Sequence, residues 1–373
     1  MKKKVLSALL CAAMVVSMTA CGLKAPETAD TTTSQTTDAA AATDAAADAA
    51  ATEASDSTGT EPVGPAVTLV YAEVNPLEGT IVGQTATAFK EKVEELSGGS
   101  ITIDIQANGV LGAESDVLDT MLGGGGTIDM ARISAFALTS YGGEKSSLLS
   151  VPFTFVSRDH FWNFATSDLA QEFLLEPHEN GTGIRGLFYG EEGFRHFFTV
   201  NPIEGMDDLA GMKIRVSESD LMLKMMESLG GVGVGLPFND TYSSIQTGVV
   251  DGAENNMTSY IEMSFYEVAP YWTYDGHSYM PDMILASKQT MDKLSADDQQ
   301  IIFDCAKEAE EWHRTAWEES EAKNAKIAEE KGCTLTTLTD DELKQFQDAV
   351  APMYDSFLND EQKAIVERVK ALA

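Results

Sequence analysis

Three arginines lie in apolar or strand-like segments of the chain. They are Arg132 in Asp-Met-Ala-Arg-Ile, Arg195 in Gly-Phe-Arg-His-Phe-Phe and Arg215 in Lys-Ile-Arg-Val. Arginine is seldom buried without a partner, and its planar guanidinium binds a carboxylate through two parallel hydrogen bonds. An internal salt bridge explains any single one of these arginines equally well. Three together favour a binding site for an organic anion.

The sequence gives no matching indication of catalysis. It contains no His-Glu-x-x-His, Cys-x-x-Cys or Gly-x-Ser-x-Gly motif, and its five histidines lack metal-ligand spacing. Gly181–Gly186 has dinucleotide-motif spacing, but an apparent helix precedes it and an apparent strand follows, the reverse of the required order. Glu191 and Glu192 are adjacent in a strand and point to opposite faces, so they cannot act as an acid–base pair. We therefore expect no enzyme, no metal site and no cofactor.

The segments that position the arginines alternate between strands and helices. The pattern predicts strands at Val67–Tyr71, Ile101–Ile105, Ile128–Arg132, Gly211–Val216 and Val249–Glu254, and helices at Gly83–Leu96, Glu114–Leu122, Leu221–Leu229 and Thr241–Thr247. A helix-rich stretch runs from about Met291 to Lys331. This order predicts an α/β fold with layers around a mostly parallel sheet.

Composition limits the partners. The chain has 373 residues, 43% of them hydrophobic, a length typical of roughly two domains. Its formal net charge is −34, from 59 acidic and 25 basic residues. Such a surface repels nucleic acid and anionic lipid headgroups. It does not exclude a small anion in a cleft, because screening confines distant charge effects to about 10 Å.

The N-terminus has the layout of a secretion signal. Lys2, Lys3 and Lys4 precede an apolar run that is too short for a membrane span, and small residues then lead to Cys21. We expect a lipoprotein signal peptide over 1–20 and a lipid on Cys21, which would anchor the protein to the outer face of the cell membrane. A plain signal peptide or an uncleaved anchor is the alternative.

Residues 21–65 are rich in Ala, Thr, Asp and Ser and predict a disordered tether. Beyond the tether, Cys305 and Cys333 are the remaining cysteines. A disulfide between them is possible in an exported protein, but two buried thiols are favoured.

Several ordered motifs resemble one family of transport proteins. The segments are Leu111–Glu114, Val151–Phe153, Gly193–Arg195, Asp208–Val216, Leu236–Phe238 with Tyr242, Gln246–Asn256 and Gly276–His277. Together they resemble the solute-binding proteins of tripartite ATP-independent periplasmic (TRAP) transporters, over the chain from near Val67 to its C-terminus. The set is specific, although each piece alone is weak.

The resemblance implies a two-lobed periplasmic-binding-protein-like fold of type II that closes like a hinged clam, with a long helix spanning both lobes. On this basis we expect lobe I to comprise 66–192 and 280–320, and lobe II 193–279 and 321–373. It also implies a membrane partner, a permease of two integral subunits driven by an ion gradient.

The resemblance further implies a ligand site. In the family the arginine of the Lys-Ile-Arg strand, here Arg215, pairs with the substrate carboxylate, and the best-matching subset handles uronates such as glucuronate or galacturonate. Carboxylates in the cleft accept hydrogen bonds from hydroxyl groups and repel a second substrate carboxylate. The expected ligand-binding residues are Arg215, Arg195, Asn255, Arg132, Glu73, Asn75, Glu114 and Phe238.

Other functions stay open at this point. A small dicarboxylate is the second ligand class, and a lipoprotein that presents its ligand to a membrane sensor is a second role. A secreted enzyme acting on sugar acids is a third. The sequence leaves open which sugar acid is bound and the oligomeric state.

Overall fold

The computed structural model describes residues 64–124 and 126–373. The expected signal peptide, the lipidation site Cys21 and the tether up to residue 63 lie outside the described residues. Among the helices of the described part, none is long and apolar enough to cross a membrane.

Within the described residues, nine strands form a single sheet in the order β2-β1-β3-β8-β4-β7-β5-β6, with β9 paired to β8. The pairings of β1 with β2 and β3, and of β5 with β6 and β7, are parallel. The strands are β1 (Val67–Ala72), β2 (Ile101–Gln106), β3 (Met130–Ser134), β4 (Ile184–Thr199), β5 (Lys213–Val216), β6 (Val232–Gly235), β7 (Gly252–Asn255), β8 (Tyr271–Ser287) and β9 (Thr334–Thr337). The predicted α/β fold with a largely parallel sheet is confirmed, but two long antiparallel strands occupy its centre.

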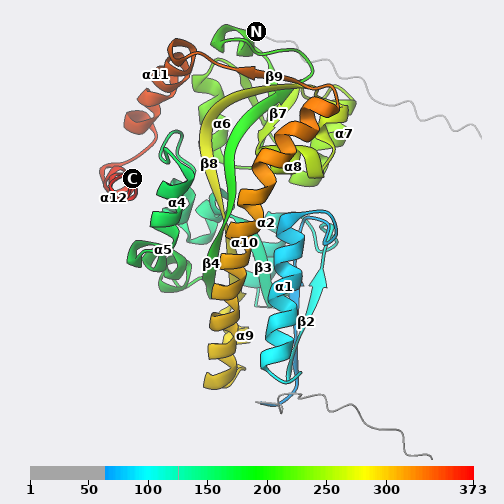
Figure 1. Ribbon diagram of the computed structural model, residues 1–373. Helices are drawn as coiled ribbons and strands as arrows, with labels where there is room; N and C mark the ends of the chain where they lie inside the picture. Colours follow the sequence, from blue (N-terminus) through cyan, green and yellow to red (C-terminus); the bar gives the residue numbers. More distant parts are fainter. Residues whose placement is uncertain (1–63, 125) are drawn as a thin grey trace, which may run out of the picture. The chain divides into compact units, whose positions relative to one another are not determined.

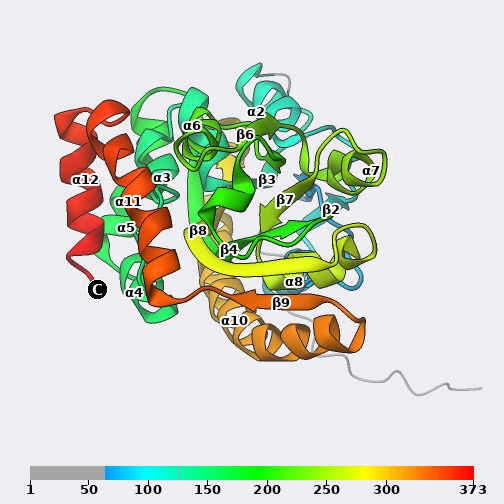
Figure 2. The ribbon, with the colours of Figure 1, turned by 90° about the horizontal axis from the view of Figure 1, so that it is seen from above.

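These two strands, β4 and β8, connect the flanks of the sheet (Figures 1 and 2). One end of β8 pairs with β3, and the other end pairs with β9. Their mutual pairing shifts register at three places, between Gly186 and Phe188, between Glu191 and Phe194, and between Arg195 and Phe197. Gly193, inside the second shift, has φ +69, a conformation that favours glycine.

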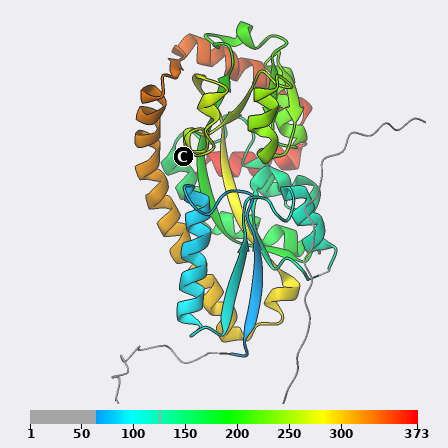
Figure 3. The same ribbon diagram turned by 90° about the vertical axis from the view of Figure 1, so that its right-hand side faces the viewer.

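Helices cover the sheet, and the longest, α10 (Ala296–Glu330), has 35 residues. At 1.5 Å per residue it is about 52 Å long. It packs against α1 (Ile81–Leu96), β4 and α8 (Met257–Glu262), and Figure 3 shows α1 alongside it. The other α-helices are α2 (Glu114–Leu122), α3 (Glu144–Leu148), α4 (Arg158–Ala165), α5 (Asp168–Glu179), α6 (Asp220–Ser228), α7 (Thr241–Gln246), α9 (Lys288–Met291), α11 (Asp340–Ser356) and α12 (Asp360–Lys370). Short 3-10 helices are η1 (Ala135–Tyr141), η2 (Met206–Leu209), η3 (Phe238–Asp240) and η4 (Phe265–Glu267).

The hydrophobic core consists of one large cluster that extends from α2 and β3 to β5 and α6, and of smaller clusters on the two flanks of the sheet. Phe89 belongs to the cluster around α1 and β1, whereas Trp272 belongs to the cluster around β7 and α8. Cys305 is buried in the first of these clusters and Cys333 is half-buried beside the second. Both are free thiols, so the possible disulfide is not formed.

Two sequence interpretations are settled by the local structure. The glycine-rich Gly181–Gly186 segment follows α5 and enters β4, so it is a turn between a helix and a strand. Glu191 and Glu192 bind different partners: Glu191 accepts hydrogen bonds from Arg158 and Trp162, and Glu192 accepts one from Arg132.

Candidate anion-binding site

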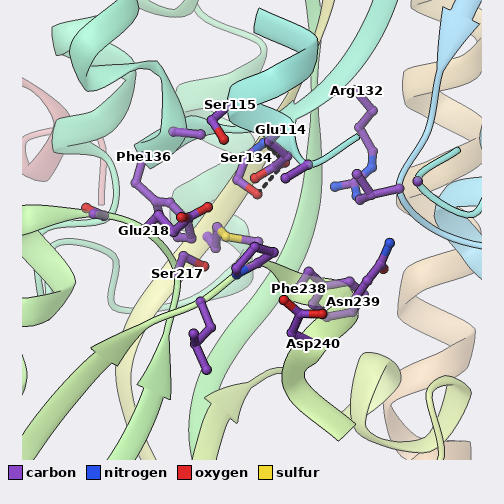
Figure 4. A pocket seen from close by; sticks show the side chains of 18 of the residues that line it. Glu114, Ser115, Arg132, Ser134, Phe136, Ser217, Glu218, Phe238, Asn239 and Asp240 are labelled. Atoms are coloured by element: carbon purple, nitrogen blue, oxygen red, sulfur yellow. Dashed lines mark hydrogen bonds between the residues drawn. The ribbon is translucent and has the colours of Figure 1, made fainter. Parts of the chain in front are cut away.

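A cavity of about 520 Å³ lies at the C-terminal ends of the parallel strands. Its lining comes from the segments after β1 and β6, the start of α2, and the ends of β3, β5 and β7. Open α/β sheets bind ligands at this edge, because the loops that follow the strands converge there. In Figure 4, Glu114, Ser134 and Arg132 lie across the cavity from Phe238 and its neighbours.

Arg215 is the residue that most strongly indicates an anion ligand. Its Nε and Nη2 atoms donate to the carbonyl oxygen of Leu236, at 3.0 and 2.7 Å. Among the residues that the structure describes, its buried Nη1 atom has no hydrogen-bond partner, and the side chain lines the cavity although only 2% of the residue is exposed. Burial lowers its pKa to about 10, so the guanidinium is still charged near neutral pH. A buried cation without a carboxylate is costly, and an anion in the cavity would remove that cost.

Arg195 also lines the cavity but already has an internal partner. Its Nε and Nη2 atoms donate to the two carboxylate oxygens of Glu254, at 2.5 and 2.8 Å. Its Nη1 atom donates to Asn255 Oδ1 at 3.2 Å, and the guanidinium lies 5.7 Å from the centre of the Phe136 ring. Its charge is therefore balanced, and it can add hydrogen bonds to a ligand but little net charge.

Glu254 is held from its other side by a histidine. His277 Nε2 lies 3.2 Å from Glu254 Oε2, and His277 Nδ1 lies 2.7 Å from Asp275 Oδ2. Burial alone would lower the pKa of His277, but the two carboxylates raise it to about 9. Burial alone would raise the pKa of Glu254, but Arg195 and His277 lower it below its ordinary value. The four side chains thus form a buried row of alternating charges.

Arg132 is surrounded by carboxylates. Its Nε donates to both oxygens of Glu73 at 3.1 Å, and its Nη1 donates to Glu192 at 3.0 Å and to Asp282 at 2.7 Å. Burial favours the neutral guanidine, but Asp282, Glu73 and Glu192 raise the pKa of Arg132 well above its ordinary value. The internal salt bridge considered for a single arginine therefore describes Arg132 and Arg195, and Arg215 is the exception.

The structure brings seven of the eight expected ligand residues to the cavity. Asn75, Asn255 and Phe238 line it together with Glu114 and the three arginines. Glu73 does not line this cavity: it is buried beneath Arg132 and also accepts hydrogen bonds from the backbone and side chain of Asn75. The expectation that Glu73 faces the cleft is therefore corrected to a supporting position behind it.

Glu114 begins α2 and contributes a half-buried carboxylate to the cavity wall. Its Oε1 atom accepts hydrogen bonds from the backbone N–H of Ser134 at 2.6 Å and from its hydroxyl at 2.8 Å. Burial raises the pKa of Glu114, and the nearby Arg132 offsets that rise only in part.

Several cavity residues were missed from the sequence. Phe136, which was not predicted, lies 5.7 Å beneath Arg195, just as the predicted Phe238 lies 5.9 Å beneath Arg215; this arrangement favours the charged form of each arginine. Glu192 was assessed only as half of an acid–base pair, and its strand position gave no indication that it faces a cleft. Further lining residues include Ser134, Ser217, Glu218, Asn239, Asp240 and Met280.

A comparison with known protein families decides the assignment. Residues 72–361 match the family described as "Bacterial extracellular solute-binding protein, family 7". The chain belongs to this family. The TRAP-type solute-binding protein expected from the motifs is thus confirmed at the level of family.

Several known proteins resemble the chain over most of its length. A solute-binding protein of Chromohalobacter salexigens is 29% identical over 279 residues, covering 74% of this chain and 81% of that protein. A TRAP periplasmic solute-binding protein from Sulfitobacter sp. NAS-14.1, solved with bound β-D-galacturonate, is 30% identical with a TM-score of 0.77, covering 82% of this chain and all (100%) of that one. Another from Pseudomonas putida F1, solved with bound D-glucuronate, is 29% identical with a TM-score of 0.77, covering 82% and 97%.

Proposed function

We propose that this family 7 protein is the sugar-acid receptor of a TRAP transporter, with a uronate such as glucuronate or galacturonate as its ligand. The observation that carries the proposal is Arg215, a cavity-lining residue whose Nη1 is buried and has no hydrogen-bond partner within the described residues. The two matched solved structures hold galacturonate and glucuronate, which supports the ligand class.

The ligand carboxylate docks on the outer edge of the Arg215 guanidinium. Leu236 O accepts from Nε and Nη2, which fixes the plane of the group and leaves Nη1 and the second hydrogen of Nη2 directed away from it. Two parallel charge-assisted hydrogen bonds fit a carboxylate there. Arg195 and Asn255 supply further polar contacts beside it.

The hydroxyl groups of the ligand face the opposite wall. Glu114 and Asn75 have oxygen atoms that accept from hydroxyl donors, and Arg132 donates to hydroxyl oxygens. A second ligand carboxylate in this place would meet Glu114 and Glu192, which disfavours small dicarboxylates. The distribution of charge therefore favours a polyhydroxy monocarboxylate.

Capture involves closure of two lobes, 66–192 with 280–320 and 193–279 with 321–373, around the cavity. The backbone N–H of Ile81 on α1 donates to Glu262 Oε1 on α8 at 3.1 Å, which joins segments of the two proposed lobes. At the cavity mouth Gly109 approaches Asn239 so closely that a Cβ on Gly109 would lie 2.3 Å from Asn239 Nδ2. Such contacts form only when the lobes are together.

Outside the cell, the receptor is held at the membrane by a lipid on Cys21 and a tether, after removal of a signal peptide over 1–20. The closed form delivers its ligand to the two membrane subunits of the permease and does not alter it chemically. Recovery of the ligand unchanged after prolonged incubation with the protein tests the last point.

The direct test of ligand class is titration calorimetry and thermal shift with uronates, aldonates and C4-dicarboxylates. A ligand that binds the folded form raises the melting temperature. We expect a uronate to bind with a Kd between about 1 µM and 1 nM, the affinity that several charge-assisted hydrogen bonds provide. If succinate or malate stabilises the protein and no sugar acid does, the proposal is wrong.

A further inference from the structure

The charges around the cavity are unevenly distributed between its two sides. On the side of β5 and β7, Glu254 balances Arg195, and Arg215 has no acidic hydrogen-bond partner within the described residues. Close to the sheet, this side therefore presents one guanidinium without a carboxylate partner, and the acidic residues Glu218, Asp220 and Asp240 line the cavity from the segment after β5 and from η3. A ligand with one carboxylate pairs with that guanidinium.

The side of β3 and α2 has an excess of carboxyl groups. Arg132 is the cation here, and three carboxyl groups hold it: Glu73, Glu192 and Asp282. Burial raises the pKa of Asp282 well above its ordinary value, and the nearby Arg132 offsets that rise only in part. Three carboxyl groups around one guanidinium give this cluster more acidic than basic groups.

Glu114 adds a further carboxylate to the same side. Its Oε1 atom accepts both hydrogen bonds from Ser134, and its Oε2 atom makes no hydrogen bond within residues 64–124 and 126–373. Asn75 uses its Nδ2 to donate to Glu73, so its Oδ1 is also left as an acceptor. Figure 4 shows Glu114 on the wall opposite Phe238, the aromatic ring beneath Arg215.

A hydroxyl group of the ligand would use only part of the hydrogen-bonding capacity of this wall. It donates one hydrogen bond and carries no charge, so the acidic excess is left unbalanced. An ammonium group donates three hydrogen bonds and carries the missing positive charge. Hydrogen bonds to a charged group are roughly twice as strong as those between neutral groups.

We infer that the site also takes zwitterionic sugar acids, in which an ammonium group lies across the ring from the carboxylate. The carboxylate would dock on Arg215 and the ammonium on Glu114 and Asn75. This inference rests on the proposed function and refines its ligand class. A pyranose uronate with an amino group at C2 has this arrangement, because C2 and C5, which bears the carboxylate, are opposite positions of the ring.

The test compares three sugar acids that differ in the charge they carry away from the carboxylate that docks on Arg215. D-glucuronate is the reference, 2-amino-2-deoxy-D-glucuronate is the zwitterion, and galactarate carries a second carboxylate. By calorimetry at pH 7 we expect the zwitterion to bind about tenfold more tightly than glucuronate, which corresponds to about 1.4 kcal/mol. We expect galactarate to bind more weakly than both.

The variant Glu114→Gln assigns the effect to one carboxylate. Glutamine keeps an oxygen for Ser134 but removes the charge, so the preference for the zwitterion should fall about tenfold. Glu91→Gln is the matched control, because Glu91 is an exposed carboxylate on α1 that does not line the cavity. Its ligand preference should match that of the parent.

The outcomes separate the two proposals. If no sugar acid binds, the proposed function itself fails. If glucuronate binds and the zwitterion binds more weakly to the parent protein, the inference is overturned whether or not the variants fold. A preference that Glu114→Gln leaves unchanged in a folded protein, as judged by circular dichroism, also overturns it.

Discussion

Replacing Arg215 by lysine tests the site at its most informative atom. The structure offers a ligand carboxylate the Nη1 and Nη2 atoms of Arg215, while Leu236 O accepts from Nε and Nη2. Lysine keeps the positive charge but has a single nitrogen, which cannot serve both the carbonyl oxygen and two carboxylate oxygens. One charge-assisted hydrogen bond is therefore lost, which costs about 1.5–3 kcal/mol. The Kd should rise about 10- to 150-fold, at about 1.4 kcal/mol for each factor of ten.

The assay is titration calorimetry with D-glucuronate, with the melting temperature as a measure of folding. The matched control is Arg185→Lys, because Arg185, on β4, lies over the Phe303 ring at 4.5 Å, has a buried Nε without a hydrogen-bond partner within the described residues and does not line the cavity. Arg185→Lys should bind like the parent. If Arg215→Lys binds as tightly as the parent, or if both variants lose affinity equally, the carboxylate does not dock on Arg215.

Three further predictions concern stability and closure. Glu254→Gln leaves Arg195 buried without its carboxylate, so the free energy of unfolding in urea should fall by about 3–5 kcal/mol; an unchanged midpoint would contradict the ion-pair reasoning. Burial raises the pKa of Glu262 to about 8 in the folded protein. Between the ordinary carboxyl pKa and pH 8, the folded state therefore holds a proton that the unfolded chain has lost. Because of this difference, the stability of the folded protein falls as the pH rises through this range. The melting temperature of Glu262→Gln relative to the parent should therefore increase from pH 5 to pH 8, and a constant difference would refute this. Gly109→Ala places a side chain at φ +63, so the free energy of unfolding, measured by thermal denaturation, should fall by about 1–2 kcal/mol. The Asn239 side chain is exposed and can turn away from the new Cβ. Adding Asn239→Ala should therefore not restore stability, and a restored melting temperature would contradict the backbone explanation.

The regular elements could be read from the sequence because their patterns are local. The helix Glu114–Leu122 was predicted with the bounds observed, and the strand Val67–Tyr71 differs from β1 by one residue. β4 and β8 were not recognised as long strands. They are buried through most of their length, so their sequences show no alternation of apolar and polar residues. Gly276 and Pro281 also interrupt the strand-like sequence pattern of β8, although the strand itself is continuous.

Only part of the candidate site could be predicted, because a local pattern identifies a residue but not the direction of its side chain or its partners in space. Arg215 was identified because its strand has a recognisable motif, and its lack of an acidic partner became visible only in three dimensions. The sequence places Glu73 near the cleft but does not give the direction of its side chain, which turns beneath Arg132. Glu192 approaches Arg132 through the pairing of β3, β8 and β4, which no local pattern reveals.

Two of the three irregularities in the β4–β8 pairing lie on either side of Arg195. A residue proposed to contact the solute is therefore on an irregular segment of the backbone, which is better suited to bend than a regular strand. Stiffening this segment by substitution would change the release rate of the solute even if every side-chain contact in the cavity were preserved. Engineering of affinity and engineering of transport speed would consequently interfere with each other at this one stretch of strand.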